Sequence, residues 1–172
     1  MKNGTVILTA SARSSKWYIR LVIWFIRKAS GYSYDHTRVW IDGYIYETTT
    51  PYGFRKTKGT LTKADGRDLL EPIIELTSAE KIAMVSYFDR RIKDNAPYNY
   101  AKLFISLLLY WSRPFFEWLK WVPFQDDKLF GDFCSSAVDE AFLFAGLDIL
   151  PEGYEEITTP GDFMKSKFFK LL

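Results

Sequence analysis

The sequence predicts one α+β domain, and three observations indicate it. Two β-rich runs flank Asp42-Gly43, a dipeptide typical of a tight hairpin. A capping box at Thr77 and Glu80 opens a helical pattern, and a second apolar helix follows Gly131. With 172 residues, 48% of them hydrophobic, the chain is long enough to bury one core and too apolar to be disordered.

The first elements are a buried strand and a helix. The run TVILTA predicts a strand at residues 5–10. Ser14 or Ser15 is the expected cap of a helix that runs to about Lys28 and stops at Gly31. Apolar residues lie at helical spacing within it, namely Trp17, Leu21, Trp24 and Phe25.

The hairpin around Asp42-Gly43 places the single histidine of the chain near a carboxylate. A two-residue loop pairs Ile41 with Tyr44, Arg38 with Glu47, and His36 with Thr49. Glu47 is then a diagonal neighbour of His36 on the same face, within reach of a glutamate side chain. The alternative that Arg38 and Glu47 form an ordinary cross-strand ion pair with no catalytic role stays open. A one-residue slip would turn Glu47 away and place Thr48 opposite His36.

The middle of the chain predicts surface strands and then a helix. The basic run RKTKG, residues 55–59, is typical of solvated surface, and GTLTK, residues 59–63, predicts a short strand. Behind the capping box at Thr77, the expected apolar face of the helix is Ile82, Val85 and Phe88, or Phe88 with Ile92. Asn95 and Pro97 end it.

Residues 101–125 form an apolar and aromatic insert, interrupted by Pro114 and Pro123. The pattern predicts two short helices. They either pack on the core or form a membrane or partner surface, since exposed apolar patches of this size usually mark contacts. The segment LFISLLLYW is too short to span a bilayer.

The single cysteine lies at the start of the next predicted helix. Cys134, Val138, Ala141, Phe142 and Ala145 share one face, and Gly146 is the expected stop. A thiol at a helix N-terminus meets partial positive charge, which favours the reactive thiolate. Inert core cysteines are the commoner case, so both interpretations stay open. The end of the chain predicts a turn, then a short helix or strand.

Composition excludes several classes of function. A net charge of +2 is too small to indicate a nucleic-acid-binding protein. One cysteine excludes an internal disulfide and any zinc site that needs several cysteines. The start of the chain lacks the apolar region of a signal peptide, so synthesis in the cytoplasm is expected. A later place in a virion or at a membrane surface stays open.

The order of these motifs resembles a known family. A strand, a helix, YSYDH, a hairpin ending in YIYETT, a helix, PYNY and FCSSAVDEAF follow one another. This order is similar to the circularly permuted branch of the NlpC-like papain superfamily, the YiiX-like cysteine hydrolases. These are relatives of the lecithin retinol acyltransferase group. The ending TTPGDFMKSKFFKLL is similar to those of phage and bacterial members. Asp35, where serine is usual, and the insert at 101–125 depart from the pattern.

The resemblance implies a papain-like α+β fold over residues 1–172, with a small antiparallel sheet or half-barrel against the helix that carries the cysteine. It implies Cys134 as nucleophile, His36 as base and then acid, and Glu47 as the residue that orients His36. The backbone N–H of Cys134 and the side chain of Tyr98 would hold the oxyanion, with Tyr34 as a further pocket residue. No metal or cofactor is implied.

The implied activity is that of a cysteine hydrolase, an amidase or peptidase that forms a thioester intermediate. Cell-wall peptides are the first substrate expectation, and lipid esters or amides, with hydrolysis or acyl transfer, are the alternative. A non-catalytic module on the same fold, such as a virion component, is a further hypothesis. A serine enzyme built on Ser135 or Ser136 is the least favoured, because it would need the same histidine.

Overall fold

The computed structural model describes residues 1–10, 17–50, 52–60, 67–99, 133–150 and 158–172. Six strands form one sheet in the order β4-β3-β2-β1-β5-β6, and each neighbouring pair is antiparallel. The strands are β1 (Thr5–Thr9), β2 (His36–Ile41), β3 (Tyr44–Thr49), β4 (Gly53–Lys58), β5 (Arg67–Pro72) and β6 (Phe169–Leu171). The strand that begins with His36 is therefore central, between β1 and β3.

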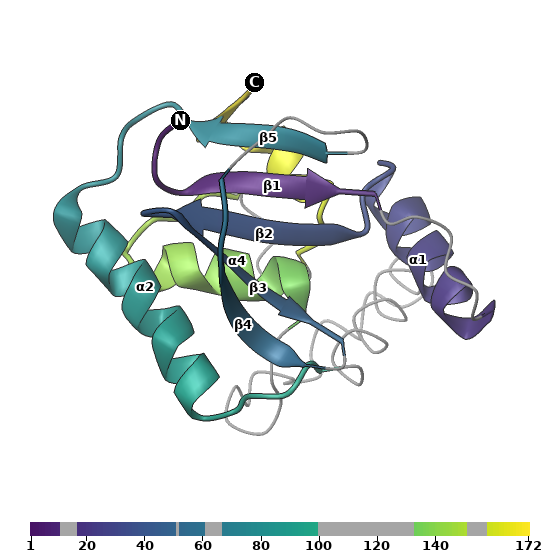
Figure 1. Cartoon of the computed structure of the whole chain (residues 1–172). Coiled ribbons are helices and arrows are strands. Elements are labelled where there is room, and N and C mark those ends of the chain that lie inside the picture. Colours follow the sequence, from purple (N-terminus) through teal and green to yellow (C-terminus); the bar gives the residue numbers. More distant parts are fainter. Residues whose placement is uncertain (11–16, 51, 61–66, 100–132, 151–157) are drawn as a thin grey trace, which may run out of the picture.

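The core lies between this sheet and two helices (Figure 1). The helices of the described residues are α1 (Trp17–Ser30), α2 (Ser78–Lys93) and α4 (Cys134–Phe144), with a 3-10 turn, η2 (Asp162–Lys165). Val39 and Tyr46 of the sheet pack with Phe88 of α2 and Phe142 of α4, and all four are fully buried. The prediction of an α+β architecture is confirmed.

The hairpin has the predicted register. Asp42 and Gly43 have φ values of 47° and 83°, the left-handed conformation that a type I′ turn requires at both central positions. Ile41 pairs with Tyr44, as the two-residue loop demands. The slip that would turn Glu47 to the other face is therefore absent.

Helix α2 begins as predicted but buries a different face. The Thr77 hydroxyl accepts from the backbone of Glu80, and the Glu80 carboxylate accepts from the backbone of Thr77. Ile82, however, is 67% exposed, so its assignment to the apolar face was wrong. Because the helix packs against both β4 and α4, the stripe it buries is Met84, Tyr87 and Phe88.

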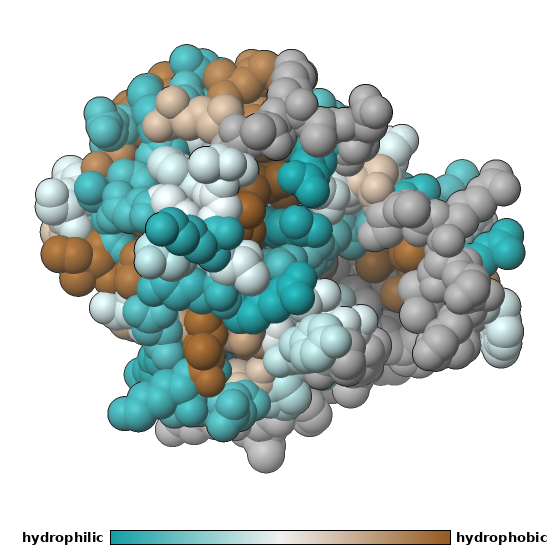
Figure 2. All heavy atoms as spheres, viewed as in Figure 1, coloured by the Kyte–Doolittle hydropathy of each residue, from teal (hydrophilic) through white to brown (hydrophobic). Residues whose placement is uncertain are grey.

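Helix α1 presents apolar side chains on two sides. Ile26 is buried, with Val22 and Phe25 packed beside it. The predicted stripe lies mostly outward, because Trp17, Leu21 and Trp24 are exposed. Figure 2 shows brown and teal side chains next to one another over this helix, at the right of the molecule. Ser14 and Ser15, the expected caps, lie outside the described residues.

Other predictions differ in outcome. Gly59 and Thr60 lie outside any strand, so GTLTK was wrong at its first two positions, and its remainder is not described. The neighbouring strands are β4 and β5 instead. The insert at 101–125 also lies outside the described residues. The buried face predicted for α4 is confirmed, and the chain ends in η2 and β6, as expected of a turn followed by a short element.

Candidate active site

Three elements bring Cys134, His36 and Glu47 together. Cys134 is the first residue of α4, His36 is the first residue of β2, and Glu47 lies within β3. Helix α4 packs against both strands. Residues from distant parts of the sequence therefore meet where the helix begins.

The cysteine lies against the start of β2. Its Sγ atom is 3.9 Å from the backbone oxygen of Asp35, the residue before the histidine. The thiol also interacts with the His36 imidazole, and this interaction contributes to the raised pKa of the histidine. Cys134 is 3% exposed and is a free thiol. The two singletons of this sequence are thus neighbours in space.

The histidine has a carboxylate on its other side. His36 Nε2 lies 2.7 Å from Glu47 Oε2. This contact confirms the diagonal pairing predicted from the hairpin. Since Nε2 faces Glu47, Nδ1 is the ring nitrogen that remains for an interaction with the thiol.

Glu47 is the centre of a cationic cluster. Its side chain is 3% exposed, and Arg38 Nε lies 3.0 Å from Oε2. Arg55 donates to Oε1 through Nε at 2.7 Å and contacts it through Nη2 at 2.6 Å. Arg55 is the direct cross-strand partner of Glu47 in the β3–β4 ladder. The prediction that the RKTKG run is only solvated surface was therefore wrong for its first residue.

These contacts shift both pKa values. Burial works against the charged form of His36, but hydrogen bonds to Cys134 and Glu47 outweigh it and raise the His36 pKa from 6.5 to about 9. Burial also opposes ionisation of Glu47, yet the hydrogen bond from His36 and the charges of Arg38 and Arg55 lower its pKa to about 2. At neutral pH the site therefore holds an imidazolium and a carboxylate.

The N-cap position of α4 is occupied by an apolar residue. This residue, Phe133, has no side-chain acceptor for the amide groups of the first turn. Ser135 and Ser136 use their hydroxyls elsewhere, since Ser135 donates to the backbone oxygen of Thr158 at 2.6 Å and Ser136 to that of Phe133 at 3.1 Å. These bonds disfavour the serine-enzyme hypothesis, because both hydroxyls are engaged with the backbone.

The two predicted pocket tyrosines have different surroundings. Tyr98 packs against Ile26 and against Phe133, which is the residue that precedes the cysteine. The Tyr34 hydroxyl instead donates to Asp68, and burial, followed by that hydrogen bond, raises the Tyr34 pKa to about 12. The geometry thus brings Tyr98 to the neighbourhood of the cysteine helix and engages the hydroxyl of Tyr34 with β5.

Asp35 has a structural partner of its own. Its buried carboxylate accepts from Arg27 Nε at 2.9 Å and also contacts Nη2 of the same side chain. The ion pair joins the end of α1 to the residue that precedes His36. Asp35 is therefore paired with an arginine of α1.

The segment after residue 157 attaches the cysteine helix to the rest of the fold. Thr158 accepts from Ser135 through its backbone oxygen and donates from its hydroxyl to Asp139 Oδ2 at 2.8 Å. All three residues are buried. These contacts secure the first two turns of α4.

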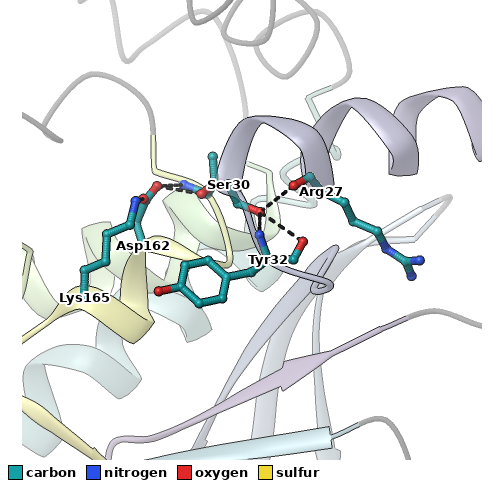
Figure 3. A network of polar contacts seen from close by, with 6 residues as sticks. Arg27, Ser30, Tyr32, Asp162 and Lys165 are labelled. Carbon is teal, nitrogen blue, oxygen red and sulfur yellow. Dashed lines mark hydrogen bonds and ion pairs between the residues drawn. The ribbon is translucent and has the colours of Figure 1, made fainter.

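The same segment also reaches the loop that leads to His36 (Figure 3). A Cβ at Gly161 would lie 2.5 Å from the Tyr32 ring and 2.7 Å from Ser30 Cβ, so only glycine allows this close approach. Asp162 Oδ2 accepts from the backbone and hydroxyl of Thr159, at 2.8 and 2.6 Å, and Oδ1 binds Lys165. Residues 158–162 therefore hold the cysteine helix and the histidine loop in one position.

Asp139 gives a test of this arrangement. Burial is the main cause that raises its pKa from 3.8 to about 6, and the carboxylates of Asp148 and Asp162 add to the shift. Because the folded state binds the proton more tightly, stability falls as pH rises from about 4 to about 6. We expect Asp139→Asn to increase the free energy of unfolding at pH 7 by up to about 3 kcal/mol, with little difference at pH 4.

Urea denaturation at both pH values measures this effect. Asp89→Asn is the matched control, because Asp89 is exposed and pairs with Lys56 at the surface. We expect less than about 0.5 kcal/mol from it. A loss of stability in Asp139→Asn at pH 7 would show that the ionised carboxylate is needed by its neighbours.

The comparisons with known proteins yield a structural relative. The fold is similar to the crystal structure of the metalloprotein YiiX from Escherichia coli O157:H7, a DUF1105 protein, with a TM-score of 0.59 and 14% identity. The match covers 99% of this chain and 96% of that one. No family profile matches the sequence. No curated protein matches it either. The chain therefore has a YiiX-like α+β fold.

The description of that relative as a metalloprotein raises the question of a metal site here. Within the ranges that the structure describes, no three His, Cys, Asp or Glu side chains lie close enough together to hold an ion. His36 and Cys134 instead face each other, and Glu47 binds two arginines. The donor set at the candidate site does not fit a metal.

Proposed function

We propose that this protein is a cysteine hydrolase on a circularly permuted papain-like fold, with Cys134 as nucleophile, His36 as proton donor and acceptor, and Glu47 as the residue that orients His36. The chain of contacts from thiol to imidazole to buried carboxylate carries the proposal. A core cysteine with no function needs neither a histidine beside it nor a charged residue behind that histidine.

The first half of the reaction forms a thioester. With a His36 pKa of about 9, the imidazole holds a proton at neutral pH. The mechanism assigns the thiolate form of Cys134 as the nucleophile. The Cys134 thiolate attacks the acyl carbon, and a C–S bond forms. His36 then gives its proton to the leaving nitrogen or oxygen as that bond breaks.

The second half releases the acyl group. Neutral His36 takes a proton from water, and the hydroxide forms a C–O bond at the thioester carbon. The C–S bond breaks, which restores the thiolate beside the imidazolium. In both halves the backbone N–H of Cys134, and Tyr98 beside Phe133, are proposed to bind the oxyanion.

The substrate class is an amide or ester of an acyl group. Peptide amides such as those of bacterial cell walls are the first candidate, and lipid esters or amides are the second. Phe133, the residue before Cys134, belongs to an apolar cluster that includes Phe25 and Tyr98, and this cluster favours a substrate with an apolar part.

Trapping of the acyl-enzyme tests the proposal. The protein is mixed with p-nitrophenyl esters of two-, eight- and twelve-carbon acids and with cell-wall peptide fragments, then quenched in acid for intact-mass measurement. We expect one acyl adduct on Cys134, removed by hydroxylamine and absent from Cys134→Ala. Equal turnover in Cys134→Ala would contradict the proposal. Ser86→Ala, at an exposed position of α2, is the control for substitution alone.

A further inference from the structure

Helix α1 has one face on the candidate site and another in solvent. Its inner side chains, Val22, Phe25 and Ile26, pack with Phe133, the residue before the cysteine. Arg27 binds Asp35, the residue before the histidine. The helix is thereby attached to both sides of the site, and whatever binds its outer face is held close to Cys134.

The outer face combines aromatic and aliphatic side chains. Trp17 is 74% exposed, Leu21 is 47% exposed and Trp24 is 52% exposed. They lie three or four residues apart, so they form one stripe along the helix. Tryptophan is enriched in membrane proteins at the interface between lipid headgroups and acyl chains.

All charged side chains of α1 are positive. Arg20 and Lys28 are exposed near the stripe, and the sequence of the helix contains no Asp or Glu. Exposed cations around an apolar stripe complement an anionic lipid surface. A protein partner would not require every exposed charge of the helix to be positive.

The length of α1 decides how it would meet a bilayer. Its 14 residues span about 21 Å, less than the hydrocarbon thickness of about 30 Å. No helix within the described part of the chain is long and apolar enough to cross a membrane. An amphipathic helix of this length lies in the plane of the interface.

We propose that the outer face of α1, formed by Trp17, Leu21 and Trp24 with Arg20 and Lys28, docks on an anionic lipid bilayer. Docking there places the candidate site at the membrane surface, where acyl substrates are concentrated. The proposal does not require catalysis, so it is tested in a protein that lacks the active cysteine.

The experiment uses the single cysteine of the chain. In Cys134→Ser protein, Leu21→Cys is labelled with an environment-sensitive dye, and Ile82→Cys on α2, also an exposed apolar position, is the matched control. We expect a blue shift and brightening only for the label at position 21. The shift should occur with vesicles of phosphatidylglycerol and phosphatidylcholine, and high salt should weaken it.

A second set of variants separates lipid binding from other outcomes. Arg20→Gln with Lys28→Gln should weaken vesicle binding about thirty-fold, from about 1 kcal/mol for each cation, and Lys93→Gln on α2 should not. Leu21→Ser with Trp24→Ser should abolish co-sedimentation with vesicles. Absence of binding, binding that these changes leave intact, or dimerisation through α1 in place of lipid binding would overturn the proposal.

Discussion

Replacing His36 with alanine is expected to lower turnover of an acyl substrate by about 10³-fold, within the range that a positioned general acid–base supplies. The imidazole is the group that faces both the thiol and Glu47. Without it, the sulfur has no partner to hold its proton and the leaving group has no donor. Steady-state rates with p-nitrophenyl esters measure the loss.

The pH dependence adds a second readout to this prediction. His36 has its folded pKa raised to about 9, above the unfolded value of 6.5. The stability it contributes is complete below pH 6.5 and is lost as pH rises through about 9. Wild-type turnover should fall on the same alkaline limb, because the leaving group then lacks its proton. Arg38→Gln is the control, since Arg38 contacts Glu47 and not the thiol, and its loss of rate should be much smaller.

Replacing Glu47 with glutamine is expected to cost about 3 kcal/mol of stability at pH 7. The folded pKa of Glu47 is about 2 against 4.5 in the unfolded chain, a difference that corresponds to roughly this free energy. A neutral amide leaves Arg38, Arg55 and protonated His36 without their common counter-charge. Urea denaturation over a range of pH measures the cost.

The sign of the effect is specific. The contribution of Glu47 is complete above pH 4.5 and is lost as pH falls through about 2, so variant and wild type should converge in acid. Glu71→Gln is the matched control. Glu71 is also a buried strand carboxylate with a lowered pKa, and it binds Lys170 far along the sheet from the cysteine. Both variants should lose stability, but only Glu47→Gln should change Cys134 reactivity. An equal cost for Glu47→Gln at pH 7 and pH 2.5 would contradict the assigned charge.

The hairpin explains why half of the candidate site was predictable. Asp42-Gly43 determines a two-residue turn, the turn determines the register, and the register brings Glu47 to His36. These relations are local, so sequence pattern is enough. Arg55 was missed because its pairing with Glu47 depends on the β3–β4 register, for which the sequence offers no turn motif of comparable strength.

Other features depend on tertiary packing that no local pattern encodes. The approach of Cys134 to His36 was expected from the family resemblance and from the need of a nucleophilic thiol for a base, because the two residues lie far apart in the chain. In α1 and α2 apolar residues lie on more than one side, and neighbours such as β4 and α4 decide which side is buried. Residues 158–162 contact α4 and the loop at Tyr32 through side chains whose partners are remote in sequence.

The most direct test of the account is the rate of Cys134 alkylation by iodoacetamide as a function of pH, in wild type and in His36→Ala. The chain has one cysteine, so incorporation of label reports this thiol alone. A thiolate paired with the His36 imidazolium should react well below pH 7, and the alanine variant should react only near pH 8.5, where an ordinary thiol ionises. Identical profiles in the two proteins, or a thiol that does not react, would contradict the central claim that Cys134 and His36 form one site.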